Sequence, residues 1–237
     1  MSETPTILLV HGAWHGSWCW ELVRPILEAH GRKVITVDLP TVHSADKASL
    51  ALADDVATVR DAIEAIDGPV VVVAHSYGGV PATVAAAGLP NVAHLVYIAA
   101  FVLDIGESLL AAVGGTPPTW WDVEGATVRA GTATEPPEGL FYGDVDPAVA
   151  ASAVARLKSQ AIKPFEDEVT AAAWHTIPST FLIAELDAIY PLQAQEALAA
   201  RAGSAVVRLQ TSHSPFLSQP ERTAEVIRDA GVAPVSS

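Results

Sequence analysis

Residues 70–82 of the chain read VVVVAHSYGGVPA, and this stretch decides the fold. A run of four valines ends at Ala74, and two polar residues and a tyrosine are followed by two glycines and an alanine-rich segment. The β-branched apolar run predicts a buried strand, and the alanine-rich segment predicts a helix. A serine on the sharp turn between such elements is a nucleophile elbow, whose usual pattern is G-x-S-x-G. Here the pattern reads Ala74-His75-Ser76-Tyr77-Gly78, so that alanine replaces the first glycine.

The elbow requires small side chains two residues before and two residues after the serine, because the strand and the returning helix approach closely there. Ala74 adds one methyl group at the first position, and Gly78 leaves the second bare. The alternative is that Ser76 only caps the following helix, since serine is a favoured N-cap residue. The β-branched run before the serine and the extra Gly79 after it favour the elbow.

Outward from this stretch, short β-branched runs alternate with longer segments rich in alanine and leucine. This alternation predicts an α/β fold, with a mainly parallel sheet of about six strands and helices on both faces. The predicted strands are Thr6–Val10, Lys33–Asp38, Val70–Ala74, Ala93–Ala99, Ser179–Ala184 and Ala205–Leu209. The predicted helices are Trp18–Ala29, Asp46–Ile66, Tyr77–Gly88, Leu192–Arg201 and Pro220–Asp229.

The alternation fails between about residues 101 and 178, where the chain carries GGTPPTWW, TATEPPEG and a helix-like stretch, Ala148–Gln160. Such an insertion is too long for a simple crossover. It leaves from the carboxyl end of the fourth strand, where open α/β sheets bind ligands, so we expect a cap over the sheet rather than a peripheral excursion. The prediction is one domain over residues 1–237, with a core at 1–100 and 179–237 and a cap at about 101–178.

The composition excludes several classes of function. Half of the 237 residues are hydrophobic. The net charge of -14 disfavours nucleic acids and anionic membranes as partners. We expect a cytoplasmic protein, because the chain has a single cysteine, no basic signal-peptide start and no long apolar span. The sequence is compatible with a homodimer. No P-loop or dinucleotide glycine pattern occurs, so we expect no cofactor and no metal.

Two further motifs follow predicted strands and offer partners for the serine. His213, in SHSPF after the last strand, is a candidate base, because a serine hydroxyl is a weak nucleophile until a base takes its proton. Asp187, in AELDAIYP after the fifth strand, is the preferred carboxylate to orient that histidine. Asp104, after the fourth strand, is a second candidate acid, and Glu185 is a third. Serine, acid and histidine in this chain order are the arrangement of an α/β-hydrolase.

The first loop, in VHGAWHGSWCW, completes the predicted site. Acyl transfer needs backbone N–H groups aimed at the developing oxyanion, and here these are the amides of Ala13 and Tyr77. Gly12 lets this loop approach closely. His11 and His15 are expected to hold the loop by hydrogen bonds, because their spacing lacks the helix and the glutamate of a metal motif.

These motifs together resemble those of a known group of proteins. The segments LLVHGAWHGSWCW, VVVAHSYGG, ELDAIYP and SHSPFLSQPE are similar to those of the α/β-hydrolase group that contains plant methylesterases, hydroxynitrile lyases and small bacterial esterases. The resemblance runs from about Thr6 to Arg228. It implies a cap around Trp120 and Trp121 over a small apolar pocket. It also implies a triad and an oxyanion hole, made of Ser76, His213 and Asp187 with the amides of Ala13 and Tyr77.

Two positions separate this chain from the lyases of the group, which resemble one another in carrying Thr after the first-loop histidine and Lys after the catalytic histidine. Here those positions hold Gly12 and Ser214. We expect both to face the substrate, together with Trp120 and Trp121. Without the lysine a lyase loses the charge that stabilises departing cyanide, whereas ester hydrolysis loses nothing. The sequence therefore predicts a cofactor-free serine esterase acting on small carboxylic esters, with a lyase or a slowly reacting ligand receptor as alternatives.

Overall fold

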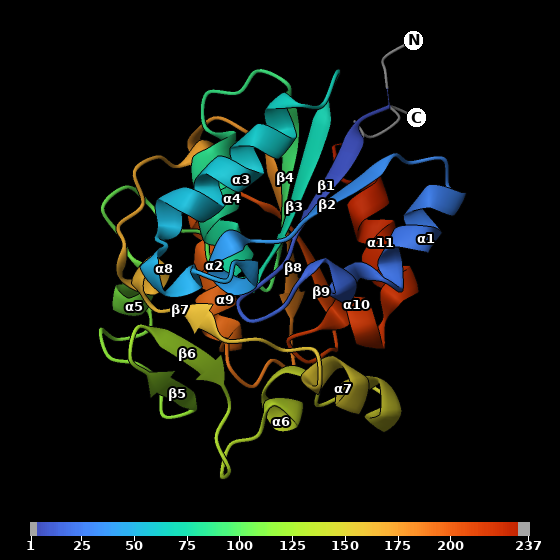
Figure 1. The fold of residues 1–237 in the computed structure, drawn as a ribbon. Helices are drawn as coiled ribbons and strands as arrows, with labels where there is room; N and C mark the ends of the chain where they lie inside the picture. The colour runs from blue at the N-terminus through green and yellow to red at the C-terminus, as the bar shows by residue number, and fades with distance from the viewer. Residues whose placement is uncertain (1–3, 232–237) are drawn as a thin grey trace.

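The computed structural model describes residues 4–231, and within that range the core is a parallel sheet of six strands (Figure 1). The strand order is β2-β1-β3-β4-β8-β9, and each strand ends on or next to the predicted residue. The prediction of an α/β fold with a mainly parallel sheet of about six strands is confirmed. The strands are β1 (Thr6–Val10), β2 (Val34–Val37), β3 (Val70–His75), β4 (Val92–Ile98), β8 (Ser179–Ala184) and β9 (Ala205–Leu209).

Helices cover both faces of the sheet (Figure 1). Helices α1 and α11 lie together on one side, and α3 and α4 lie together on the other. The helices outside the insertion are α1 (Val23–Ala29), α2 (Pro40–His43), α3 (Leu52–Glu64), α4 (Gly79–Ala86), α9 (Leu192–Arg201), α10 (Pro215–Ser218) and α11 (Pro220–Asp229).

Three predicted helices are shorter than expected. The segment predicted to begin at Asp46 first makes a 3-10 turn, Lys47–Ser49, and its helix starts only at Leu52 because residues 50 and 51 are extended. The segment predicted from Trp18 divides into the 3-10 turn Ser17–Trp20 and α1, whose first turn holds a proline without an N–H to donate. The helix predicted from Tyr77 likewise begins with a 3-10 turn, and its α-helical part starts at Gly79.

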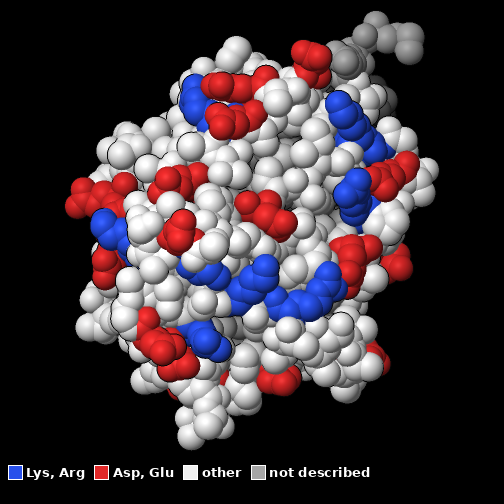
Figure 2. Space-filling view, in the orientation of Figure 1, with Lys and Arg blue, Asp and Glu red and all other residues white. Residues whose placement is uncertain are grey.

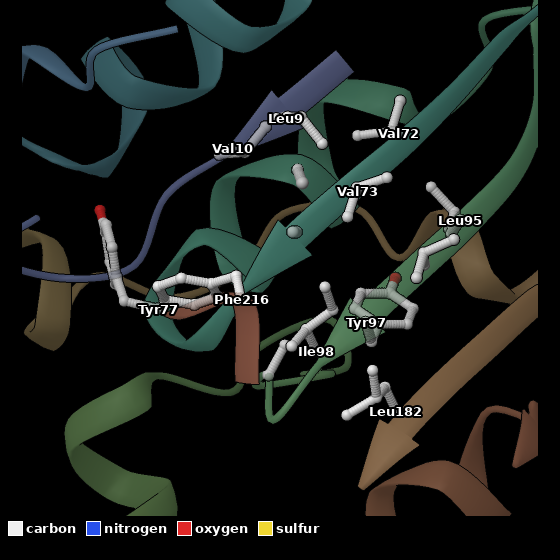
Figure 3. Packing of buried hydrophobic residues seen from close by; sticks show 14 of the residues in the cluster. Leu9, Val10, Val72, Val73, Tyr77, Leu95, Tyr97, Ile98, Leu182 and Phe216 are labelled. Atoms are coloured by element: carbon white, nitrogen blue, oxygen red, sulfur yellow. The ribbon is translucent and has the colours of Figure 1, made fainter. Parts of the chain in front are cut away.

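The sheet is buried on both faces by apolar side chains. All residues of β1, β3 and β8 are buried, as expected for parallel strands covered by helices on both sides. Figure 3 shows this packing, with buried side chains from neighbouring strands, among them Leu9 of β1, Val72 of β3, Leu95 of β4 and Leu182 of β8. This rigid core fixes where each strand ends, and therefore where the loops that follow the strands begin.

The strand order places a switch point between β1 and β3. From β1 the chain moves outward to β2, returns to β3 on the other side of β1, and then continues toward β9. Val10, the last residue of β1, pairs with Ala74 of β3, so both strands end at the same level. Ligands of open α/β sheets bind at such a point, beyond the carboxyl ends of the strands.

The insertion after β4 lies across the carboxyl ends of the strands, at the bottom of Figure 1. In the described chain its strands form a three-stranded antiparallel sheet. The predicted helix Ala148–Gln160 is too long, because the helix ends at Val154 and the chain then turns so that the Lys158 amide donates to Trp14. The elements are α5 (Leu109–Ala112), β5 (Trp121–Glu124), β6 (Thr127–Ala130), α6 (Pro137–Phe141), α7 (Pro147–Val154), β7 (Gln160–Ala161) and α8 (Lys163–Glu166).

The surface mixes charges of both signs. On the face shown in Figure 2, acidic side chains lie in separate small groups, and Lys and Arg side chains form a broken band among them. Most basic side chains are paired with nearby carboxylates, as Arg208 is with Glu185 and Glu196. Within residues 4–231 the structure contains no helix of the length and hydrophobicity that a membrane crossing requires.

Candidate active site

Ser76 lies on a strained turn at the carboxyl end of β3. Its backbone φ is +52°, a left-handed conformation that a non-glycine residue adopts only where the surrounding structure holds it. A Cβ atom on Gly78 would lie 2.4 Å from the carbonyl oxygen of His11, so a bare residue is needed two positions after the serine. Ala74 is buried at the end of β3, where its methyl group is accommodated. These features are those of a nucleophile elbow.

His213 and Asp187 are joined by a short hydrogen bond beneath the surface. The imidazole Nδ1 donates to the Asp187 Oδ2 at 2.6 Å, and both side chains are fully buried. The other carboxylate oxygen accepts the amides of Ile189 at 3.0 Å and Tyr190 at 2.9 Å. With Nδ1 protonated and bound in this way, Nε2 is the nitrogen with a free lone pair, as a general base requires.

The two competing carboxylates have other partners. Asp104 is exposed and accepts a hydrogen bond from His175 at 2.9 Å. Glu185 pairs with Arg208 at 3.3 Å on the surface. Neither contacts the histidine, and so the structure brings only Asp187 of the three candidates to His213.

The first loop packs directly against the serine. A Cβ atom on Gly12 would lie 2.9 Å from the Ser76 Cβ and 2.6 Å from the His75 Nδ1, so any side chain larger than hydrogen would push the loop away. Trp14, two residues on, has a left-handed φ of +62°. The close approach places Ala13 at the same cavity as Ser76 and Tyr77. Both residues predicted to supply oxyanion donors thus lie beside Ser76.

The histidines of the first loop hold it in place. His11 Nδ1 donates to the Gly12 carbonyl at 2.8 Å, and its Nε2 accepts the Leu39 amide at 3.0 Å. His15 donates from Nδ1 to the Ala13 carbonyl at 2.7 Å and accepts from the Tyr142 hydroxyl at 2.8 Å. These bonds fix the peptide groups on both sides of Ala13, the predicted oxyanion donor, which is the structural role expected for both histidines.

A cavity of about 510 Å³ opens above the serine, between the sheet and the cap. Aromatic and aliphatic side chains make most of its wall, and Ser76 and His213 lie at its floor. Among the described lining residues there is no Lys, Arg, Asp or Glu. Aromatic residues of the wall are Trp14, Tyr77, Phe101, Trp120, Trp121, Phe165 and Tyr190.

The serine hydroxyl is not tied to a protein partner. Within residues 4–231 no hydrogen bond to the Ser76 Oγ occurs, although His213 lines the same cavity. Bonds between nucleophile and base often tighten only once substrate is bound. The arrangement leaves the Ser76 hydroxyl available to a ligand in the cavity.

Of the four residues expected to face the substrate, two line the cavity and two do not. Trp120 and Trp121 line the cavity. Gly12 packs against His75 and Ser76 and is not among the residues that line the cavity. Ser214 is fully buried at the start of α10 and also lies outside the lining, because its side chain turns into the protein.

Sequence reasoning missed several residues of the cavity wall. Trp14 belongs to the first-loop motif, but a local pattern does not reveal its left-handed backbone conformation or its place in the cavity wall. Tyr190 lies three residues after Asp187 in the motif AELDAIYP, and this proximity to the predicted acid could have indicated its place at the site. Phe165 comes from the cap, where sequence patterns carry little information about position.

One group of side chains has the spacing of metal ligands. A ring nitrogen of His11, a ring nitrogen of His43 and a carboxylate oxygen of Asp38 lie within 4.8 Å of one another. The ring nitrogens are already engaged, because His11 Nε2 accepts the Leu39 amide and His43 Nε2 donates to the His15 carbonyl at 3.0 Å. The group is therefore a hydrogen-bonded support of the first loop.

Burial keeps three histidines around the site neutral. It lowers the pKa of His11 to about 4 and that of His15 to about 3, and it lowers the pKa of His75 well below the ordinary value of 6.5. The folded protein resists their protonation, whereas the unfolded chain takes up protons as the pH falls below about 6.5. Protonation therefore favours the unfolded state.

We expect the free energy of unfolding to fall as the pH drops from 6.5 to about 4, by roughly 1 kcal/mol per pH unit for each of His11 and His15, and His75 acts in the same direction. Asp55 opposes them, because burial raises its pKa to about 6 and the folded state takes up its proton first. Urea midpoints measured at several pH values test this expectation. His15→Gln should reduce the slope, whereas His30→Gln, at an exposed position, should leave it unchanged. Equal midpoints at pH 7 and pH 5 would contradict it.

Known proteins are similar to this chain in both sequence and fold. The model of the alpha/beta hydrolase family matches residues 7–226. The chain is similar to an alpha/beta hydrolase of Aspergillus novofumigatus, with 29% identity over 95% of this chain and 96% of that protein. It is also similar to methylesterase 7 of Arabidopsis thaliana, with 38% identity in an alignment that covers 42% of this chain and 41% of the relative. A solved pyrethroid hydrolase of Sphingobium faniae has a TM-score of 0.82 and 26% identity, covering 97% of this chain and 98% of that one.

Proposed function

The chain belongs to the alpha/beta hydrolase family, and from this premise we propose that it is a cofactor-free serine esterase acting on small, uncharged carboxylic esters. Its relatives include proteins named as a methylesterase and a pyrethroid hydrolase, which place it among the carboxylic ester hydrolases. The observation that carries the mechanism is the pair of His213 and Asp187 at the cavity that exposes Ser76.

In the proposed reaction, His213 Nε2 takes the proton of the Ser76 hydroxyl as its oxygen attacks the ester carbonyl. The carbonyl oxygen becomes an oxyanion and accepts hydrogen bonds from the amides of Ala13 and Tyr77. His213 then returns the proton to the leaving alcohol, and an acyl group remains on Ser76. Water, deprotonated by His213, attacks this acyl-enzyme, and the carboxylic acid is released with the serine restored.

The cavity supports a substrate without charge. An ionised group placed in the cavity loses its hydration. None of the described lining residues is a Lys or Arg whose positive charge would compensate a carboxylate for that loss. Burying an unpaired carboxylate costs several kcal/mol, so charged esters bind poorly. The aromatic walls and the volume of about 510 Å³ suit an ester that carries a ring.

Two positions favour hydrolysis over cyanohydrin cleavage. The residue after His213 is Ser214, which is buried and uncharged, so no cation stands there to stabilise cyanide. At Gly12 a threonine side chain would collide with Ser76 and His75. Both observations support ester hydrolysis as the reaction of this site.

A matched pair of esters tests the proposal. We expect kcat/KM for methyl 4-methylbenzoate to exceed that for methyl 4-carboxybenzoate by ~100-fold or more, because the two differ only in a methyl group and a carboxylate of similar size. Acid release is followed by titration at constant pH. A fluorophosphonate that reacts with activated serines should abolish both activities and add its mass to the peptide that contains Ser76.

Similar rates for the two esters would contradict the assigned substrate class. Labelling of a peptide other than that of Ser76, with activity lost, would contradict the assigned nucleophile. Cyanide release from mandelonitrile without ester hydrolysis would instead support a lyase.

A further inference from the structure

Asp55 is a buried carboxylate that the proposed reaction does not use. It lies in the first turn of α3 and is fully buried. Its Oδ2 accepts hydrogen bonds from the Tyr77 hydroxyl at 2.6 Å and the Thr41 hydroxyl at 2.7 Å, and its Oδ1 accepts the Thr41 amide at 3.1 Å. Among the ion pairs of residues 4–231 none involves Asp55. Three neutral donors thus hold a carboxylate inside the protein without a cation.

The hydrogen bonds continue from Asp55 to the first loop. The Thr41 hydroxyl accepts from the Gln160 Nε2 at 3.1 Å, and the Gln160 Oε1 accepts the backbone amide of Trp14 at 3.1 Å. Gln160 belongs to β7 of the cap and is fully buried. One chain of contacts therefore runs from the side chain of Tyr77 through Asp55 to the backbone of Trp14.

Both ends of this chain adjoin an oxyanion donor. Tyr77 supplies one amide itself, and Ala13, which supplies the other, precedes Trp14 directly. In Figure 3 the Tyr77 side chain extends with its hydroxyl oxygen directed away from Phe216. On that far side it meets Asp55.

Each arm of the oxyanion hole also contains a strained residue. Ser76, before Tyr77, has a φ of +52°, and Trp14, after Ala13, has a φ of +62°. Left-handed conformations at such residues persist only when neighbouring contacts hold them. The indole of Trp14 adds one such contact, donating to the Val128 carbonyl of the cap at 3.1 Å.

We propose that Asp55 is a positioning residue that sets both arms of the oxyanion hole, holding Tyr77 directly and the Ala13–Trp14 peptide through Thr41 and Gln160. The inference rests on the proposed function, since it concerns the transition state of that reaction. A carboxylate suits the task because it only accepts hydrogen bonds, and its two oxygens serve three donors. An asparagine offers one acceptor oxygen and a donating nitrogen, so at least one of the three donors loses its partner.

The test compares two variants in the network with one outside it. Asp55→Asn changes the acceptor, and Tyr77→Phe removes one donor while keeping the ring. Tyr97→Phe is the matched control, because its hydroxyl is equally buried and bonds the Thr83 hydroxyl at 2.8 Å in the sheet core. For each variant, kcat and KM are measured with p-nitrophenyl acetate. Inhibition constants are measured with a trifluoromethyl ketone, whose serine adduct carries an oxyanion.

For Asp55→Asn and Tyr77→Phe we expect kcat to fall by ~10- to 100-fold, less than the loss of a whole oxyanion donor. The inhibition constant of the ketone should rise by a similar factor, whereas KM changes by no more than ~2-fold, because only the charged transition state uses the hole. Tyr97→Phe should lose as much thermal stability as Tyr77→Phe and retain the wild-type kcat. The double variant that combines Asp55→Asn with Tyr77→Phe should lose less kcat than the product of the two single losses, since both substitutions act through one network.

The proposal is overturned if Tyr77→Phe, folded as judged by its circular dichroism, keeps a kcat and a ketone affinity within ~2-fold of wild type. It is also overturned if Tyr97→Phe loses as much kcat as Tyr77→Phe. Either result leaves the esterase proposal intact as long as the wild-type protein hydrolyses the ester and the serine-directed phosphonate stops it. A wild-type protein without that activity would remove both proposals.

Discussion

Replacement of Ser76 by alanine is expected to lower kcat by ~10⁶-fold, with a residual rate still above that of the uncatalysed reaction. The variant lacks the oxygen that forms the acyl-enzyme in the proposed reaction, while the proposed oxyanion donors and the cavity remain. We expect the left-handed φ of +52° to be retained, because alanine keeps the Cβ of serine and lacks only the hydroxyl. Steady-state hydrolysis of p-nitrophenyl acetate measures the loss, and rapid mixing should show that the burst of p-nitrophenol has vanished.

Ser218→Ala is the matched control for this substitution. The Ser218 hydroxyl is buried in α10 and has no hydrogen-bond partner in the described chain, so its removal costs no bond. This variant should keep the wild-type kcat and burst. If Ser76→Ala also kept a burst, the nucleophile would have to be another residue.

The second large effect is expected at the carboxylate that orients the histidine. Asp187→Asn should lower kcat by ~10⁴-fold, because the amide nitrogen donates toward His213 Nδ1 and favours the tautomer with its proton on Nε2. In that tautomer Nε2 carries the proton and has no lone pair to receive the serine proton. The amides of Ile189 and Tyr190 keep an acceptor oxygen, so the loop keeps its conformation. We expect the variant to fold and KM to change little.

Asp104→Asn distinguishes orientation by Asp187 from orientation by the competing acid. Asp104 lies exposed beside His175, and its substitution should leave kcat unchanged. Measurement of kcat for both variants at pH 8 decides between them. A large loss in Asp104→Asn together with full activity in Asp187→Asn would reverse the assignment of the acid.

The features that the sequence predicts well are those that depend on neighbours along the chain. The strand that ends before Ser76 is a run of β-branched residues, and the parallel sheet buries such a run whatever lies above it. His213 and Asp187 were found because strand ends converge at one edge of the sheet, so that order along the chain predicts position. A local pattern was sufficient wherever the regular sheet supplied the rest.

Features that depend on distant contacts were not predicted. Asp55 is one of 27 acidic residues and has no local signal, because its partners are Thr41 of the short helix α2 and Tyr77 of the turn after β3. Gln160, predicted to end a helix, instead forms a short strand that contacts Trp14, 146 positions away. The cap hairpin of β5 and β6 was also missed, although Gly125 with a φ of +58° marks its turn.

The uncharged wall of the cavity has a consequence for the end of the catalytic cycle. A carboxylic acid formed in the cavity ionises at neutral pH once water reaches it, since such groups have a pKa of about 4. In the proposed reaction the ester that enters is neutral, and the anion that results is poorly solvated by aromatic side chains. The cavity that attracts the substrate thus repels the product, so that ionisation makes release favourable and keeps accumulated acid from occupying the enzyme.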